Sequence, residues 1–133
     1  MTYYADLTEY VYLDSDVPMR NVGWLDRDHD FPCGRSDPAT VEALVVAAQT
    51  TRHQTRGYHE CELCWWRPAD DRPYPFVMNV PGSDVRLTLG SAEIHATGAD
   101  GTVYAAPDLV VHYVVTHDYL PPAAFVSAVL AGI

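Results

Sequence analysis

The chain has 133 residues, and its 18 acidic and 8 basic residues give it a net charge of −10. This length suits a single domain over residues 1–133, and a hydrophobic fraction of 48% is enough to fill one core. A surface this acidic repels phosphate backbones, which excludes broad electrostatic binding of nucleic acid and favours a basic protein as any partner.

The sequence also lacks the segments that direct a chain into or across a membrane. Residues 1–12 have no basic start followed by an apolar run, which is the pattern of a secretory signal. No apolar stretch approaches the ~20 residues needed to span a bilayer. Three cysteines, two of them spaced Cys-x-x-Cys, do not form a disulfide framework. We therefore expect a cytoplasmic protein that does not bind membranes.

The first part of the chain predicts a short strand, an ordered loop and a helix. Alternating side chains favour a strand over residues 10–13, and the Gly, Asp and Pro content of residues 21–34 favours a loop. Asp37 and Pro38 suit the N-cap and the first position of a helix that runs to residue 49. The apolar face of this helix comprises Val41, Leu44, Val45 and Ala48.

Short runs of strand-forming residues occupy the centre of the chain. A polar, proline-containing connector over residues 68–75 precedes them. Turns that contain glycine separate the runs, and such spacing favours an antiparallel meander. The expected strands cover residues 76–80, 85–89, 92–97 and 102–105.

Two helices are expected at the end of the sequence. The first begins near Pro107 and Asp108 and runs to about residue 116. The second begins at Pro121-Pro122, and its apolar face comprises Phe125, Val126, Val129 and Leu130. The predicted fold class is therefore α+β, with a small antiparallel meander packed against about three helices.

The strongest chemical motif is the pair Cys61-x-x-Cys64. Two thiolates at this spacing can reach one metal ion from a tight turn. His112 and His117 follow at a spacing typical of paired zinc histidines. The sequence therefore predicts a Zn²⁺ site that links the segment around Cys61 and Cys64, which we call the cysteine segment, to the C-terminal helices.

The two histidines can share an ion only under a geometric condition. Five residues along an ideal helix leave two side chains ~140° apart, so the helix must end or unwind near His117. His59 is a rival ligand, because it lies two residues before Cys61 and would point to the same side of an extended segment. The predicted ligands are thus His59, Cys61, Cys64, His112 and His117, and which histidines complete the site stays open.

The cysteines also have other interpretations. A redox pair usually opens a helix after a strand, whereas the sequence after Cys64 is Trp-Trp-Arg-Pro, which is poor for a helix. Both cysteines could be plain core residues, and His112 a core histidine bonded to a carboxylate. Cys33 has no partner at ligand spacing and is predicted to be structural. The remaining histidines are predicted to lie on the surface, namely His29, His53 and His95.

Several motifs together resemble a family of small uncharacterised bacterial proteins that is common in actinobacteria. They are Asn-Val-Gly-Trp-Leu-Asp at residues 21–26, Gly-x-His-x-Cys-x-x-Cys at residues 57–64, and His-Tyr-Val-x-x-His-x-Tyr-x-Pro-Pro at residues 112–122. The resemblance covers nearly the whole chain. It implies a cytoplasmic stand-alone domain and supplies no function.

Two functions fit a zinc site of this kind. A closed site with four protein ligands would stabilise a protein-interaction module. A site with three protein ligands and a water would instead belong to a small zinc enzyme, with Glu60, Glu62, Glu93 or Asp118 as a general base. The number of protein ligands separates the two hypotheses.

Overall fold

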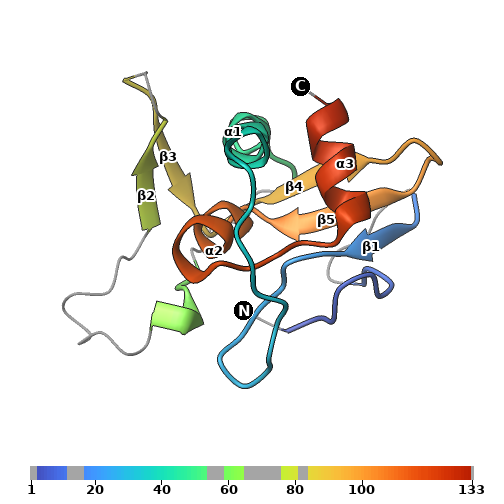
Figure 1. The fold of residues 1–133 in the computed structure, drawn as a ribbon, viewed down its shortest axis with the longest axis horizontal. Helices are drawn as coiled ribbons and strands as arrows, with labels where there is room; N and C mark the ends of the chain where they lie inside the picture. The colour runs from blue at the N-terminus through green and yellow to red at the C-terminus, as the bar shows by residue number, and fades with distance from the viewer. Residues whose placement is uncertain (1–2, 12–16, 54–58, 65–75, 81–83, 133) are drawn as a thin grey trace.

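The structure is a computed structural model that describes residues 3–11, 17–53, 59–64, 76–80 and 84–132. In this part of the chain, two small sheets lie to either side of a short helix (Figure 1). The elements in chain order are β1 (Met19–Asn21), α1 (Pro38–Ala47), the 3₁₀ turn η1 (Glu62–Cys64), β2 (Phe76–Asn79), β3 (Arg86–Leu89), β4 (Glu93–Thr97), β5 (Val103–Pro107), α2 (Val110–His117) and α3 (Ala123–Ala131).

The strands pair in two separate sheets. In the first, β5 lies between β1 and β4, parallel to β1 and antiparallel to β4. In the second, β2 and β3 form an antiparallel pair in which Phe76 faces Leu89. The predicted α+β class and the antiparallel pairing of consecutive strands are therefore confirmed. The expected single meander is divided between β3 and β4.

The division occurs at Gly90, which has a φ of +111°, a conformation that side chains rarely adopt. The backbone of Gly90 turns away from the hairpin and bonds elsewhere. Its carbonyl accepts the N–H of His59 at 2.8 Å, and its own N–H donates to the Asp108 carboxylate at 2.7 Å. The chain therefore leaves the second sheet at this residue and enters the first.

Two details of the N-terminal part differ from the expectation. Tyr10 and Val11 are not in a strand, and the other half of the expected strand, residues 12–13, lies outside the described residues. The strand that does form is β1, because the parallel pairing with β5 organises it from a distance. Glu9 only forms a single bridge to Arg20 of this strand. The connector expected over residues 68–75 also lies outside the described residues.

The helices begin and end close to the predicted residues. Asp37 occupies the N-cap of α1, and its backbone carbonyl accepts the N–H groups of Thr40 and Val41. The predicted N-cap position is therefore confirmed, and among the described residues the cap is made by the backbone and not by the carboxylate. Asp108 precedes the N-cap of α2, Leu109, and its carboxylate accepts the N–H of Gly90.

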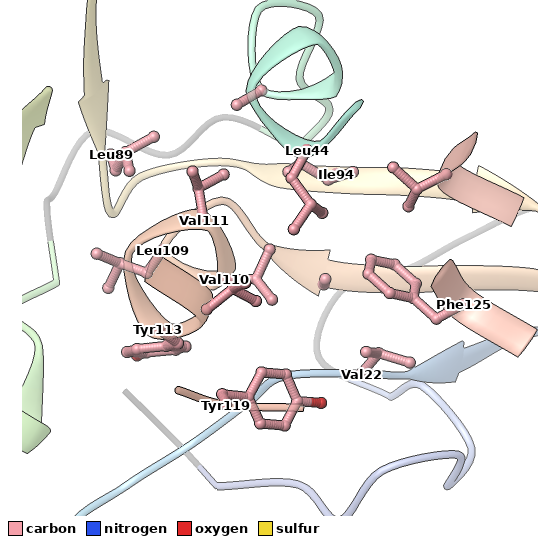
Figure 2. Packing of buried hydrophobic residues seen from close by; sticks show 14 of the residues in the cluster. Val22, Leu44, Leu89, Ile94, Leu109, Val110, Val111, Tyr113, Tyr119 and Phe125 are labelled. Atoms are coloured by element: carbon pink, nitrogen blue, oxygen red, sulfur yellow. The ribbon is translucent and has the colours of Figure 1, made fainter. Parts of the chain in front are cut away.

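The three helices and the first sheet share one core. Leu44 of α1, Ile94 of β4 and Phe125 of α3 are almost completely buried, and they lie to one side of the start of α2 (Figure 2). The ring of Phe125 meets Tyr104 of β5 edge to face, with centroids 6.2 Å apart. In α3, Phe125, Ala128 and Val129 are buried, whereas Val126 and Leu130 are only partly covered. The core thus fixes α2 between the two sheets.

Among the described residues, no helix has the length and apolar character needed to cross a bilayer.

Candidate metal centre

The cysteine segment approaches α2 as a tight turn. The N–H of Cys64 donates to the carbonyl of Cys61 at 3.2 Å, which closes the 3₁₀ turn η1. Side chains three residues apart are eclipsed in a 3₁₀ turn, so both thiols project from the same side. Both cysteines are buried at 3% exposure, and this side of the turn faces the end of α2.

The end of α2 explains how two histidines five residues apart meet. Asp118, just after the helix, has a left-handed backbone with φ 54°. Its N–H and that of Tyr119 both donate to the carbonyl of Tyr113, so the last turn is wider than an α-helical turn. A wider turn brings residue 117 back towards residue 112. The rings of His112 and His117 consequently lie with centroids 5.0 Å apart, at 90° to each other.

Four side chains converge at this place. The Nε2 atom of His117 lies 3.4 Å from the Sγ atoms of both Cys61 and Cys64, and His112 Nε2 lies 3.4 Å from Cys64 Sγ. One ligand atom from each of the four residues lies within 4.8 Å of all the others. The four residues, Cys61, Cys64, His112 and His117, form what we call the Cys/His cluster, and this arrangement can hold a metal ion.

Apolar side chains of the described residues pack against the Cys/His cluster. Phe76 of β2 covers the ring of His112, with centroids 4.1 Å apart. Burial raises the pKa of the Cys61 thiol to about 12, and the neighbouring Cys64 adds to the shift. Reactive redox cysteines have a lowered pKa, so the shift of the Cys61 pKa is in the opposite direction. A cation bound between the sulfurs would favour the thiolates that ligation requires.

His59, the fifth predicted ligand, is not part of the Cys/His cluster. Its backbone is tied to Gly90 by a hydrogen bond, and it is half-buried. Burial lowers the pKa of its imidazole. The expectation of an extended segment that aligns His59 with Cys61 was therefore incomplete, because η1 turns the thiols towards α2 while the Gly90 contact holds His59 in place.

The other sequence predictions have mixed outcomes. His29 is exposed as expected, stacked on Tyr3 at 3.8 Å between ring centroids. Cys33 is exposed and lies outside the Cys/His cluster. His53 and His95, expected on the surface, are half-buried instead, and both contact the buried carboxylate of Glu93. The sequence held a signal for this group, because Glu93 and His95 lie two residues apart and share a face of β4.

The fold and the Cys/His cluster define a small α+β protein with a potential metal site. The chain belongs to the family described as "Domain of unknown function (DUF7919)", whose model matches residues 2–130. This agrees with the resemblance to an uncharacterised family. Comparisons with curated proteins and with solved structures found no match.

Proposed function

We propose that the Cys/His cluster binds one Zn²⁺ ion, and that this ion holds the fold together as a closed structural site. The observation that carries the proposal is the separation of the ligand atoms. Zinc lies ~2.3 Å from thiolate sulfur and ~2.0–2.1 Å from imidazole nitrogen, and the ligands form a tetrahedron. In such a tetrahedron a sulfur and a nitrogen lie ~3.6 Å apart. Three of the four sulfur-to-nitrogen distances in the cluster are 3.4 Å, and the fourth, between Cys61 and His112, is within 4.8 Å.

The number of ligands supports a structural role. Two cysteines and two histidines fill the four positions of a tetrahedral zinc ion, so no position remains for a reactive water. Three of the four side chains are buried, and Phe76 packs over one of them. An enzyme site at this ion would need one of the four to be displaced. The arrangement therefore favours structure over catalysis at this place.

The position of the Cys/His cluster indicates what the ion would stabilise. It joins η1, which lies between two stretches outside the described residues, to the end of α2. The core holds α2 in place, Cys61 and Cys64 belong to the same core, and the backbone bond between His59 and Gly90 ties the residues before η1 to the end of β3. The free energy of zinc binding at this link would add to the free energy of folding, as in other small zinc domains.

We propose that this domain, stabilised by the zinc ion, binds a partner protein in the cytoplasm. The net charge of −10 supports a basic protein surface as the partner. Such an association weakens as salt screens the charges. The partner can be isolated from the native cell by cross-linking and its affinity measured at low and high ionic strength. An affinity that does not change with salt would contradict the electrostatic part of the proposal.

The test of the zinc site compares two cysteine substitutions in the full chain. The purified protein should retain about one zinc ion per chain against a weak chelator, and Cys64→Ser should remove it and lower the free energy of unfolding by several kcal/mol. Cys33→Ser is the matched control, because Cys33 is exposed and outside the cluster, and it should change neither quantity. The proposal fails if Cys64→Ser is as stable as Cys33→Ser.

The histidines test the structural role separately. His112→Ala and His117→Ala should both weaken zinc binding strongly and destabilise the protein, because each removes one of four ligands. If His117→Ala keeps its metal and stability while an activity disappears, the structural role is wrong and a catalytic metal takes its place.

A further inference from the structure

A second group of metal-ligating side chains lies away from the Cys/His cluster. His53, Glu93 and His95 each offer a ligand atom, and these atoms all lie within 4.8 Å of one another. Oε1 of Glu93 is 3.0 Å from Nδ1 of His53 and 2.8 Å from Nε2 of His95. The two imidazole rings are nearly perpendicular at 88°, with centroids 4.9 Å apart. We call these three residues the His/Glu cluster.

The backbone holds the His/Glu cluster in place from both sides. Glu93 and His95 alternate along β4, which pairs with β5 over its whole length. Arg52, the residue before His53, exchanges two backbone hydrogen bonds of 2.8 Å with Glu93. His53 itself has a left-handed backbone with φ 50°, which residues other than glycine adopt rarely and mostly where the surroundings require it. This conformation accompanies the approach of its ring to Glu93.

Glu93 is unusual as a buried carboxylate whose contacts are mainly to histidines. Its side chain is 3% exposed, and its second oxygen, Oε2, accepts the hydroxyl of Tyr10 at 2.6 Å. A carboxylate that binds a metal through one oxygen is commonly held through the other by a hydrogen bond of this kind. Tyr10 is therefore placed as a positioning residue, and Oε1 is left facing the two imidazoles.

The separations within the His/Glu cluster fit one ion. Two atoms that each lie ~2.1 Å from an ion and bind it at right angles are ~3.0 Å apart. The two distances from Glu93 Oε1, 3.0 and 2.8 Å, are close to this value. They are also the distances of two hydrogen bonds from histidine to a carboxylate, so the experiment below has to separate these two arrangements.

We propose that His53, Glu93 and His95 form a second metal site, which takes a divalent first-row transition ion through two imidazoles and one carboxylate. Three ligands on one side of an ion leave other coordination positions open. His95 and Arg52 line a hollow of about 480 Å³ between the end of α1, β4 and α3, so the His95 side of the site borders an open space. The His/Glu cluster differs in this way from the closed Cys/His cluster.

The test uses Co²⁺ as the probe on the full chain with the Cys/His cluster filled by Zn²⁺. Calorimetry should show one further equivalent of Co²⁺. Visible spectra should show the weak bands of a five- or six-coordinate ion and no charge transfer from thiolate, because the second site contains no sulfur. Paramagnetic shifts of the ring protons of His53 and His95 should identify the site in the unaltered protein.

Substitutions then separate ligation from hydrogen bonding. Glu93→Gln keeps the shape and an acceptor for Tyr10 but removes the anionic ligand, and saturable Co²⁺ binding should disappear. Tyr10→Phe keeps all three ligands and should weaken binding by about 10- to 100-fold, as the loss of an outer hydrogen bond does. His29→Gln is the control, because His29 pairs with Asp26 at 2.7 Å on the surface without a second histidine, and it should leave the affinity unchanged.

Circular dichroism of each variant establishes that it is folded. The proposal is overturned if the unaltered, zinc-loaded protein takes up no Co²⁺, or if folded Glu93→Gln binds Co²⁺ as tightly as the unaltered protein. Either result would identify the His/Glu cluster as a hydrogen-bonded network around a buried carboxylate.

Discussion

Replacing Gly90 with alanine should displace the cysteine segment, although the substitution changes none of the four residues of the Cys/His cluster. A Cβ atom at Gly90 would lie 2.7 Å from the carbonyl oxygen of His59 and 3.2 Å from its nitrogen. Ordinary contact begins at 3.4 Å, so the His59 backbone would have to move by about 0.7 Å. Cys61 is only two residues further along the chain, and a displacement of this size therefore reaches the proposed zinc ligands.

The magnitude follows from two costs. A φ of +111° is strained for alanine, at about 1–3 kcal/mol. Loss of the 2.8 Å bond between His59 N–H and the Gly90 carbonyl adds about 0.5–1.5 kcal/mol. We expect Gly90→Ala to lower the free energy of unfolding by about 1.5–4.5 kcal/mol and to weaken zinc affinity.

Gly101→Ala is the matched control for this experiment. Gly101 also has a positive φ, +87°, but a Cβ there meets nothing within 4 Å. It should cost only the backbone strain, about 1–2 kcal/mol, and leave zinc affinity unchanged. Urea unfolding with zinc and with a chelator measures both quantities. If Gly90→Ala and Gly101→Ala lose equal stability and bind zinc equally well, the Gly90 contact does not position the cysteines.

Two further substitutions test buried polar groups. Burial raises the pKa of Asp108 to about 6. Folding therefore favours the protonated form of the Asp108 carboxyl. Its contribution to the stability of the protein, about 3 kcal/mol, is present below pH ~4 and is lost as the pH rises through about 6. In urea unfolding with a chelator, Asp108→Asn should have the same free energy of unfolding as the wild type near pH 4 and a higher one at pH 8. If the difference in free energy does not vary with pH, the burial of the Asp108 charge does not destabilise the protein. Tyr119→Phe removes a 2.8 Å hydrogen bond from a buried hydroxyl to Asp6 and should cost about 1–3 kcal/mol in the same assay, whereas an unchanged midpoint would show that the bond contributes nothing.

The elements with local signals were predictable from the sequence. The apolar spacing of Leu44, Val45 and Ala48 and the proline at residue 38 located α1 to within two residues of its end. Alternating apolar residues between glycine turns located β2 to β5. The short strand β1 carries no comparable signal, because its three residues are ordered by parallel pairing with β5, more than eighty residues later in the chain. Pairing over such a distance leaves no local pattern.

The two candidate metal sites also differ in how far the sequence predicted them. The spacing of Cys61 and Cys64 and the condition on the end of the helix at His117 together pointed to the four residues that converge. His59, the rival ligand, lies outside the Cys/His cluster, where its backbone is bound to Gly90, and this contact leaves no ligand pattern in the sequence. The His/Glu cluster was missed because His53 reaches Glu93 only through the backbone bridge at Arg52.

X-ray absorption at the zinc edge of the purified full chain measures the ligands of the proposed zinc ion. We expect a four-coordinate ion with two sulfur ligands at ~2.3 Å and two nitrogen ligands at ~2.0–2.1 Å. Loss of one sulfur in Cys64→Ser, with the spectrum of Cys33→Ser unchanged, would assign the ligands. A protein without bound zinc, or with zinc surrounded only by nitrogen and oxygen, would contradict the proposed structural site.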